Sequence, residues 1–287
     1  MINERARSYY RFLRAWLLSL DLRTYGPFFL SEEEKRASAA MSIIVPIHDA
    51  PEATQRCLAS LERFGGEAEV ILVDDGSTLE RTRRMLDEFC ERNNWKLVRH
   101  QTALGHSRAS EAGISISSHP YLCLLNSDTV VTPRSWFGIS QTFNNNPEVA
   151  VVGPSTSHTP TPQCVDRACY CRYYWSDEQI WLFAEKYTAR WRGQPPTYLP
   201  KVGGFAFFVR RSVWDRFGGF DKSLADYGNE MELCQRIGAA GLKIVWTKAS
   251  YIHHLGHASY QETFGMELIR KKCQAARRYI DQKLLKA

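Results

Sequence analysis

Short β-branched runs alternate with amphipathic helical patterns in the first half of the chain. The runs cover residues 42–47, 70–73, 96–99 and 121–125, and apolar residues at helical spacing separate each run from the next. Such alternation predicts a parallel sheet whose strands are joined by right-handed crossover helices. Asp49 and Pro51 are typical of the start of the first helix, with Asp49 as its N-cap. We therefore expect an α/β fold with a Rossmann-like, mostly parallel sheet flanked by helices.

Helical segments of basic composition are expected at both ends of this α/β region. Residues 1–40 are predicted to form an amphipathic helix followed by a charged linker at 31–36. Residues 261–287 are predicted to form one long basic helix, because the pattern contains no internal breaker. The α/β domain is expected between them at 41–260, with an insertion rich in Pro, Thr, Tyr and Trp at 155–200.

The net charge of +6 is concentrated at the two ends of the chain. Basic amphipathic helices suit an anionic membrane surface, and solvated faces of packing helices are the alternative. A membrane span needs about 18–20 consecutive apolar residues, and no run in the sequence reaches that length. We therefore expect a cytoplasmic protein, soluble or peripheral on the inner face of the membrane, without a nucleic-acid partner.

Two adjacent carboxylates follow the second run, at the edge where a parallel sheet binds its ligands. Asp74 and Asp75 precede Gly76, which allows a sharp turn and the close approach of a ligand. The pair predicts a site for a polar ligand such as a nucleoside. A turn and helix cap made by Asp75 and Ser77 is the alternative.

Asp128 follows the fourth run, which is expected to belong to the same sheet. Mg²⁺ and Mn²⁺ favour one or two carboxylates together with the phosphate oxygens of a bound substrate. Asp128 is therefore a candidate metal ligand, and a simple turn over residues 126–129 is the alternative.

Further polar residues lie in the C-terminal half. Glu230 is expected at the start of a helix over 230–240, either as a general base aimed into the cleft or as an ordinary N-terminal acid. Three histidines occur within five positions, and imidazole is the commonest metal ligand, so that a functional loop is favoured there. They are His253, His254 and His257.

The cysteines fall into two groups. Four lie in apolar periodic segments and are expected to be core thiols: Cys57, Cys90, Cys123 and Cys234. Three others cluster near His158: Cys164, Cys169 and Cys171. Their spacing differs from the paired C-x₂-C pattern of most zinc sites, and the alternatives are a zinc site and a loop of free thiols.

Six runs of the sequence, taken in order, resemble the inverting family-2 glycosyltransferases of GT-A fold, in particular the rhamnosyltransferase-like branch that makes bacterial surface polysaccharides. The resemblance extends from Ser42 to about Tyr260. Short motifs rarely keep both order and spacing by chance. The runs are SIIVPIHDAPEATQRCLASL, ILVDDGST, LGHSRASEAG, YLCLLNSDTVVTP, GGFAFFVRRSVWDRFGGFD, and YGNEMELCQRIGAAGLKIVW leading to IHHLGHAS.

The resemblance implies a role for residues in most of these runs. The donor nucleotide would be bound by Pro46, Ile47, His48, Asp74, Asp75, Arg108 and Ser127. Asp128 matches the last acid of the family's metal-binding D-x-D motif, in which Asn126 replaces the first, and His253 or His254 would be the second ligand. The acceptor side would be formed by Gly203, Gly204 and Phe205.

Glu230 matches the catalytic base of the family. In many members the base is the aspartate of a Glu-Asp pair, whereas this chain has Asn229-Glu230. Asp226 and Glu232 are therefore the alternative bases.

The implied reaction is an inverting transfer of a sugar from a UDP-, GDP- or dTDP-sugar to a hydroxyl group of a saccharide or lipid-linked acceptor. It would use Mn²⁺ or Mg²⁺. One alternative is a nucleotidyltransferase, although the Gly-rich loop typical of that class is missing after the first predicted strand. Another is a non-catalytic nucleotide- or glycan-binding domain, which the amides Asn126 and Asn229 favour.

Overall fold

The computed structural model describes residues 28–165, 176–256 and 258–284. Its strands are β1 (Met41–Ile47), β2 (Glu69–Asp75), β3 (Lys96–His100), β4 (Tyr121–Leu125), β5 (Thr129–Val130), β6 (Val149–Ser155), β7 (Thr197–Tyr198), β8 (Ala206–Arg210), β9 (Lys243–Tyr251) and β10 (His253–His254). Its helices are α2 (Glu32–Ser38), α3 (Pro51–Phe64), α4 (Glu80–Asn93), α5 (His106–Ser115), α6 (Phe137–Asn145), α7 (Asp177–Trp191), α8 (Arg211–Phe217), α9 (Asn229–Ala239) and α10 (Ala258–Leu284).

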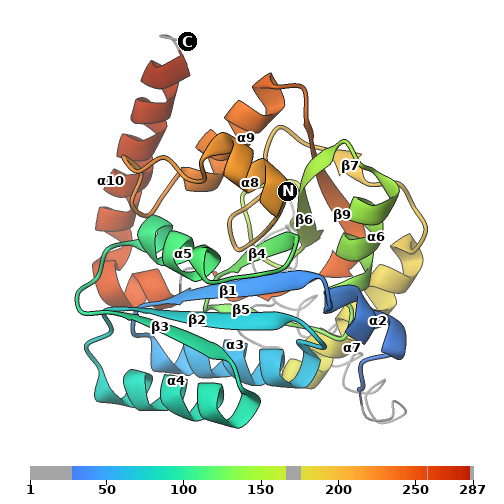
Figure 1. The fold of residues 1–287 in the computed structure, drawn as a ribbon, viewed down its shortest axis with the longest axis horizontal. Coiled ribbons are helices and arrows are strands. Elements are labelled where there is room, and N and C mark those ends of the chain that lie inside the picture. Colours follow the sequence, from blue (N-terminus) through green and yellow to red (C-terminus); the bar gives the residue numbers. More distant parts are fainter. Residues whose placement is uncertain (1–27, 166–175, 257, 285–287) are drawn as a thin grey trace, which may run out of the picture.

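Eight strands form one sheet in the order β3-β2-β1-β4-β8-β6-β9-β7 (Figure 1). β3, β2, β1 and β4 are parallel, as the alternation predicts. β8 runs antiparallel to both β4 and β6, whereas β6 and β9 are parallel. β10 and β5 form a separate two-stranded antiparallel sheet. The predicted α/β, mostly parallel architecture is confirmed.

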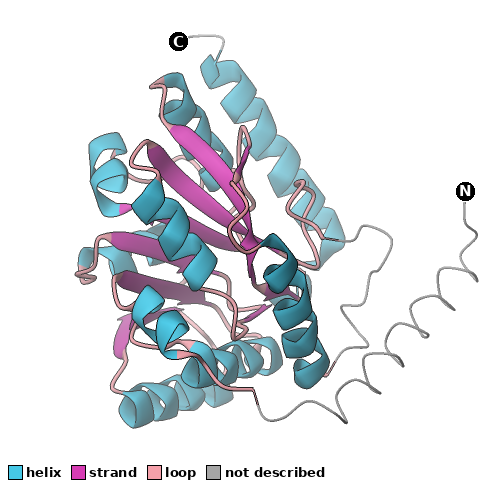
Figure 2. Cartoon of the chain, turned by 90° about the vertical axis from the view of Figure 1, so that its right-hand side faces the viewer, coloured by secondary structure: helices cyan, strands magenta, loops and turns pink. Residues whose placement is uncertain are grey.

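Helices cover both faces of the large sheet (Figure 2). Apolar side chains from one face of the sheet share a core with α3, α4, α6 and α7. Those of the other face pack against α5, α8 and α9. Because both faces are covered, β1 is buried along its whole length, which explains its continuous apolar sequence.

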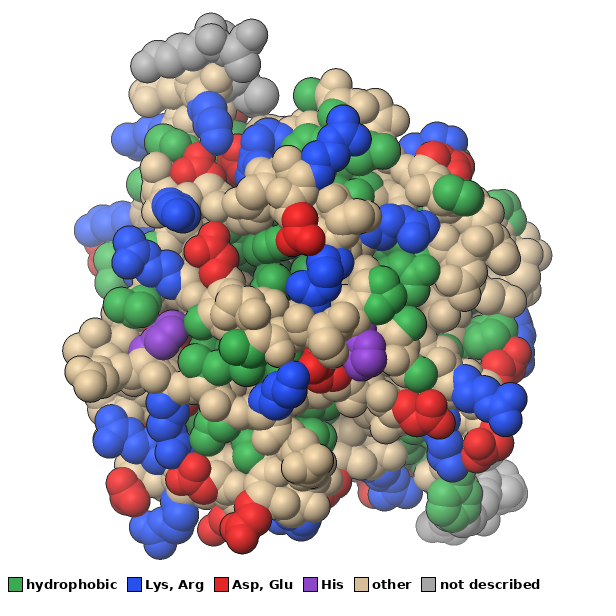
Figure 3. All heavy atoms as spheres, in the orientation of Figure 1, with side chains coloured by type: hydrophobic (Ala, Val, Ile, Leu, Met, Phe, Trp, Pro, Cys, Tyr) green, Lys and Arg blue, Asp and Glu red, His purple; other side chains and the backbone are tan. Residues whose placement is uncertain are grey.

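The C-terminal helix α10 packs against the rest of the structure. Ala276 and Ile280 are buried beside Leu224, and Lys272 forms an ion pair with Asp226 at 2.6 Å. Part of the helix is therefore a packing face, which was the alternative to a membrane surface. On the face drawn in Figure 3, basic and acidic side chains are interspersed. Within the described residues, no helix is long and apolar enough to cross a membrane.

Two local predictions were wrong. The segment expected as a charged linker contains α2, whose first turn is capped by the Ser31 hydroxyl accepting from the backbone N–H of Glu34. Asp49 is not the N-cap of α3, because that position is Ala50. The Asp49 carboxylate instead accepts the backbone N–H groups of Thr78 and Leu79 just before α4. The predicted helix within residues 1–27 lies outside the described residues.

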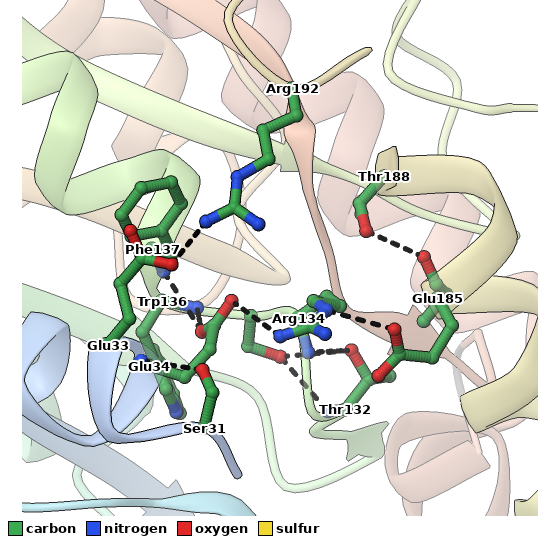
Figure 4. Close-up of polar contacts among 12 residues, drawn as sticks. Ser31, Glu33, Glu34, Thr132, Arg134, Trp136, Phe137, Glu185, Thr188 and Arg192 are labelled. Atoms are coloured by element: carbon green, nitrogen blue, oxygen red, sulfur yellow. Dashed lines mark hydrogen bonds and ion pairs between the residues drawn. The ribbon is translucent and has the colours of Figure 1, made fainter. Parts of the chain in front are cut away.

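A buried carboxylate attaches α2 to the domain (Figure 4). Oε2 of Glu34 accepts the backbone N–H groups of Trp136 and Phe137, at 3.1 and 3.0 Å, where α6 begins. Arg134 lies 3.8 Å from the other oxygen of Glu34 and donates to Glu185 on α7 at 3.0 Å. Burial raises the pKa of Glu34 to about 7, although the two backbone N–H groups and Arg134 favour its charged form.

We expect Glu34→Gln to flatten the dependence of stability on pH. The raised pKa means that the stability contributed by Glu34 is fully present below pH 4.5 and is lost as the pH rises through about 7. A difference of about 2.5 between the pKa of Glu34 in the folded and unfolded states changes the free energy of unfolding by roughly 3 kcal/mol over this pH range. The glutamine oxygen can still accept both backbone N–H groups. Urea unfolding at a series of pH values measures the slope.

Glu33→Gln is the matched control, because it removes an exposed carboxylate from the same helix. We expect this variant to keep the wild-type slope. Equal slopes for Glu34→Gln and the wild type would contradict the prediction.

Candidate active site

The small sheet of β5 and β10 joins two parts of the chain that are far apart in sequence. His254 pairs with Thr129, and the backbone N–H of Leu255 donates to the carbonyl of Asp128 at 2.9 Å. These backbone bonds place the two side chains together, with Nε2 of His254 3.3 Å from Oδ1 of Asp128.

The orientation of the His254 ring follows from its second nitrogen. Nδ1 lies 2.8 Å from the carbonyl oxygen of His158, which can only accept, so Nδ1 carries the proton. Nε2 is then the ring nitrogen that faces the Asp128 carboxylate. The Phe205 ring stacks on this imidazole at a centroid distance of 5.4 Å. A carboxylate facing an imidazole whose orientation is fixed in this way is an arrangement that suits a divalent cation.

His253 has a different environment. Its ring is fully buried, and Nδ1 lies 3.0 Å from the hydroxyl of Tyr251. Burial lowers its pKa to about 3, with Arg56 and His254 contributing in the same direction. The geometry therefore favours His254 over His253 as the metal ligand, a choice that the sequence left open.

A cavity of about 540 Å³ opens beside this pair. Six of the predicted site residues line it: Asp128, Gly203, Gly204, Phe205, Glu230 and His254. Residues that are as far apart in sequence as Asp128 and His254 therefore line a single cavity.

Glu230 enters the cavity from the first turn of α9. The helix begins after Gly228, whose left-handed φ of 83° starts the turn. A Cβ atom on Gly204 would lie 3.0 Å from the carboxyl carbon of Glu230, so the glycine leaves the room that this carboxylate occupies. Burial raises the pKa of Glu230 above its usual value of 4.5, against the opposing charge of Lys201.

The two alternative bases are held by basic residues. Glu232 is bound by Arg236 at 2.7 Å and by Lys283 at 2.6 Å, and it does not line the cavity. Asp226 lines the cavity, but Lys272 pairs with it at 2.6 Å. Glu230 is thus the best placed of the three.

The carboxylates that end β2 bind groups of the protein itself. Asp74 accepts from Nε of Arg99 at 3.1 Å and from the backbone N–H of Ser77 at 2.9 Å. This is a turn of the kind expected as the alternative, although Asp74 makes it in place of Asp75. Asp75 accepts the backbone N–H groups of Leu104 and Gly105 at 2.9 and 2.8 Å, and so fixes the loop before α5.

The other residues predicted to bind the donor nucleotide also lie outside the cavity lining. Pro46 and Ile47 are buried at the end of β1, and Ser127 is buried in the turn after β4. Nδ1 of His48 donates to the carbonyl of Asp75 at 2.9 Å. Arg108 is exposed on α5.

His106 is a cavity residue that the sequence analysis missed. It starts α5 and lines the cavity together with Asn126. Burial lowers its pKa, against the charges of Asp226 and Asp75. Its position in the GHSRAS run, two residues before Arg108, was the available signal. Lys201 and Arg277 also line the cavity and carried no such signal.

The two-residue set fits a metal that takes most of its ligands from substrate and water. Within the described residues, no group of three or more His, Cys, Asp or Glu side chains converges on one point. Mg²⁺ and Mn²⁺ sites that bind phosphates need only one or two protein ligands, which Asp128 and His254 supply. Of the suggested zinc residues, Cys164 is a free thiol, and Cys169 and Cys171 lie outside the described residues.

The four cysteines expected in the core are buried free thiols, as predicted. They are Cys57, Cys90, Cys123 and Cys234.

Comparison with known proteins finds that the family model for glycosyl transferase family 2 matches residues 42–217. The O-antigen biosynthesis protein RfbC of Myxococcus xanthus is 25% identical over 241 residues, which cover 76% of this chain and 18% of that protein. The chain thus spans less than a fifth of the length of this relative.

Two solved structures are similar in fold. GalNAc-T7 with UDP, GalNAc and Mn²⁺ has a TM-score of 0.58 at 18% identity, over 75% of this chain and 43% of that one. The mannosyltransferase PcManGT of Pyrobaculum calidifontis, in complex with GDP-Man and Mn²⁺, has a TM-score of 0.54 at 14% identity, over 87% of this chain and 67% of that one. The GT-A fold implied by the sequence motifs is confirmed.

We expect His254→Gln to weaken the binding of Mn²⁺ in the presence of UDP at least about tenfold, because it replaces the nitrogen that faces Asp128. Titration of Mn²⁺ followed by electron paramagnetic resonance measures this affinity. His253→Gln is the matched control and should bind Mn²⁺ like the wild type. Weaker binding in the control together with normal binding in His254→Gln would contradict the assignment.

Proposed function

The chain belongs to glycosyl transferase family 2, and on this basis we propose that it transfers a sugar from a nucleoside diphosphate sugar to an acceptor hydroxyl with inversion. One observation carries the proposal: the Asp128–His254 pair and the Glu230 carboxylate line the same cavity. A group suited to the leaving diphosphate and a group suited to the attacking hydroxyl are therefore present together.

The first of these groups acts on the donor. Asp128 and His254 would hold Mn²⁺ or Mg²⁺, and when bound the ion neutralises the negative charge that develops on the departing diphosphate. The protein's own part is orientation: the His158 carbonyl fixes the tautomer of His254, and the Phe205 ring fixes its plane. Groups that are preorganised in this way need little rearrangement during the reaction.

The second group acts on the acceptor. The acceptor oxygen forms a bond to the anomeric carbon as the bond from that carbon to the diphosphate oxygen breaks. Glu230 takes the proton of the acceptor hydroxyl in this step, and the nucleoside diphosphate leaves with the electron pair. A base is most effective when its pKa lies near the operating pH, and burial moves the pKa of Glu230 in that direction.

The nucleotide is proposed to bind at the ends of β1, β2 and β4 and at the start of α5. The residues that the resemblance implies there are Pro46–His48, Asp74, Asp75, Ser127 and Arg108. The hydrogen bonds support an indirect part for Asp75, which fixes the loop from Leu104 to Gly105. That loop presents His106 to the cavity. Asp75 therefore shapes the donor side through the backbone.

The acceptor is proposed to approach along Gly203, Gly204 and Phe205, which line the cavity next to Glu230. A saccharide and a lipid-linked saccharide both fit this proposal, as do UDP-, GDP- and dTDP-sugars on the donor side. A cytoplasmic location, peripheral on the membrane, stays a prediction.

Family membership favours glycosyl transfer over the nucleotidyl transfer considered from the sequence. The presence of Asp128, His254 and Glu230 at one cavity favours catalysis over a binding-only domain.

We expect Glu230→Gln to lower kcat at least about a hundredfold, because the amide cannot accept the proton. Binding of UDP with Mn²⁺, measured by titration calorimetry, should stay at the wild-type level. Asp226→Asn is the comparison variant, and we expect a smaller loss of kcat because Lys272 already neutralises this carboxylate. Turnover of Glu230→Gln near the wild-type rate would contradict the assignment.

The rate should also depend on pH through this residue. A general base works only when ionised, so kcat/KM should fall as the pH drops through the pKa of Glu230. Because burial raises that pKa, the loss should begin above 4.5. A kcat/KM profile for donor hydrolysis, with UDP binding measured at each pH as the control, tests this. Full activity down to pH 4.5 would refute it.

A further inference from the structure

Helix α10 is attached to the segment that precedes the catalytic helix α9. Lys272 pairs with Asp226, and Lys283 pairs with Asp221 at 2.7 Å. Between these ion pairs, Ala276 packs against Gly228: a Cβ atom on this glycine would lie 3.2 Å from the Cβ of Ala276. Gly228 is two residues before Glu230, so this part of α10 lies beside the proposed base.

The neighbouring ridge of α10 faces the cavity. Cys273 and Arg277 are four residues apart, and residues at this spacing share one face of a helix. Both line the cavity together with Glu230. Burial raises the pKa of Cys273, and the charge of Glu230 contributes in the same direction.

Arg277 differs from the other α10 cations described above. Lys272 and Lys283 are neutralised by carboxylates, whereas no carboxylate in the described residues pairs with Arg277, which is exposed at the cavity. Lys201, another cation of the cavity lining, donates to the sulfur of Met231 at 3.3 Å. No ion pair with a carboxylate joins it to the described part of the chain.

The carboxylates of the cavity do not balance these two cations. Asp226 is neutralised by Lys272, and Asp128 faces His254. Glu230, which must be ionised to act as a base, offsets only one of the two cations Lys201 and Arg277. The side of the cavity near Glu230 thus carries surplus positive charge, and arginine is the side chain best suited to bind the oxygens of a phosphate group.

We propose that Arg277 and Lys201 form an anion subsite for the acceptor, and that the acceptor carries a phosphate group near the hydroxyl that is glycosylated. This inference rests on the proposed function. The two cations line the same cavity as Glu230. They are residues other than the Asp128–His254 pair that is proposed to serve the donor diphosphate.

The test uses the full chain, first without nucleotide and then with UDP and Mg²⁺ in excess, so that the donor diphosphate site is filled in the second titration. Methyl phosphate is the probe, and its binding is followed by the broadening of its ³¹P resonance. We expect saturable binding by the wild type and binding at least about tenfold weaker in Arg277→Gln. Arg278→Gln is the matched control, since it removes the same charge from the next exposed residue of α10, which does not line the cavity. It should bind like the wild type.

Three results would overturn the subsite: no binding of methyl phosphate by the wild type, equal binding by Arg277→Gln, or binding that disappears when UDP is added. The last would assign Arg277 to the donor diphosphate. UDP binding is measured separately. Its absence would refute the proposed function, whereas the anion subsite would still be tested by the methyl phosphate titration without nucleotide.

A second arm distinguishes the sources of the phosphate. Sedimentation of the chain with phosphatidylcholine vesicles, with and without phosphatidic acid, shows whether Arg277 also binds a phosphate carried by a lipid. Binding that depends on phosphatidic acid and is lost in Arg277→Gln supports a lipid-linked acceptor. Binding of methyl phosphate alone supports a soluble phosphorylated acceptor.

Discussion

The pairing of β5 with β10 is the interaction on which the rest of the site depends. Two residue pairs hold these strands together, yet they bring His254 to the turn that carries Asp128. Two hydrogen-bond acceptors that face each other at 3.3 Å are stabilised by a cation between them, either a proton or a metal ion. The His158 carbonyl holds a proton on the far nitrogen of His254, so that Nε2 is the atom that faces Asp128.

The position of Glu230 depends on two glycines, which have no side chain. Gly204 leaves room for its carboxylate, and Gly228 allows both the left-handed turn before α9 and the close approach of α10. A larger residue at either position would move Glu230 relative to Asp128, and distances between reacting groups strongly affect rates of transfer. The base is therefore held by backbone conformation and by packing against α10, and less by hydrogen bonds of its own.

The sequence predicted the parallel half of the sheet well, because alternating strands and helices are a local pattern that topology rules convert into a fold. It also singled out Asp128, Glu230 and the glycines before Phe205, which the structure places around one cavity. It could not choose between His253 and His254, since the choice depends on the register of β10 against a strand far away in sequence. Nor could it show that Asp74 and Asp75 bind Arg99 and backbone N–H groups, because those partners meet only in the fold.

The basic composition of α10 shows why charge alone is a weak guide to function. The same type of residue has three roles along this helix: Lys272 and Lys283 hold it to the domain, Arg277 faces the cavity, and Arg278 is exposed elsewhere. Single ion pairs at a surface contribute little, about 0–1 kcal/mol each, but here they accompany the burial of Ala276 and Ile280. Part of the basic charge that suggests a membrane surface in the sequence is thus neutralised by the ion pairs that hold α10 to the domain. The positive charge that remains lies at the cavity beside the proposed base Glu230, and an anionic acceptor is the ligand that such a charge would select.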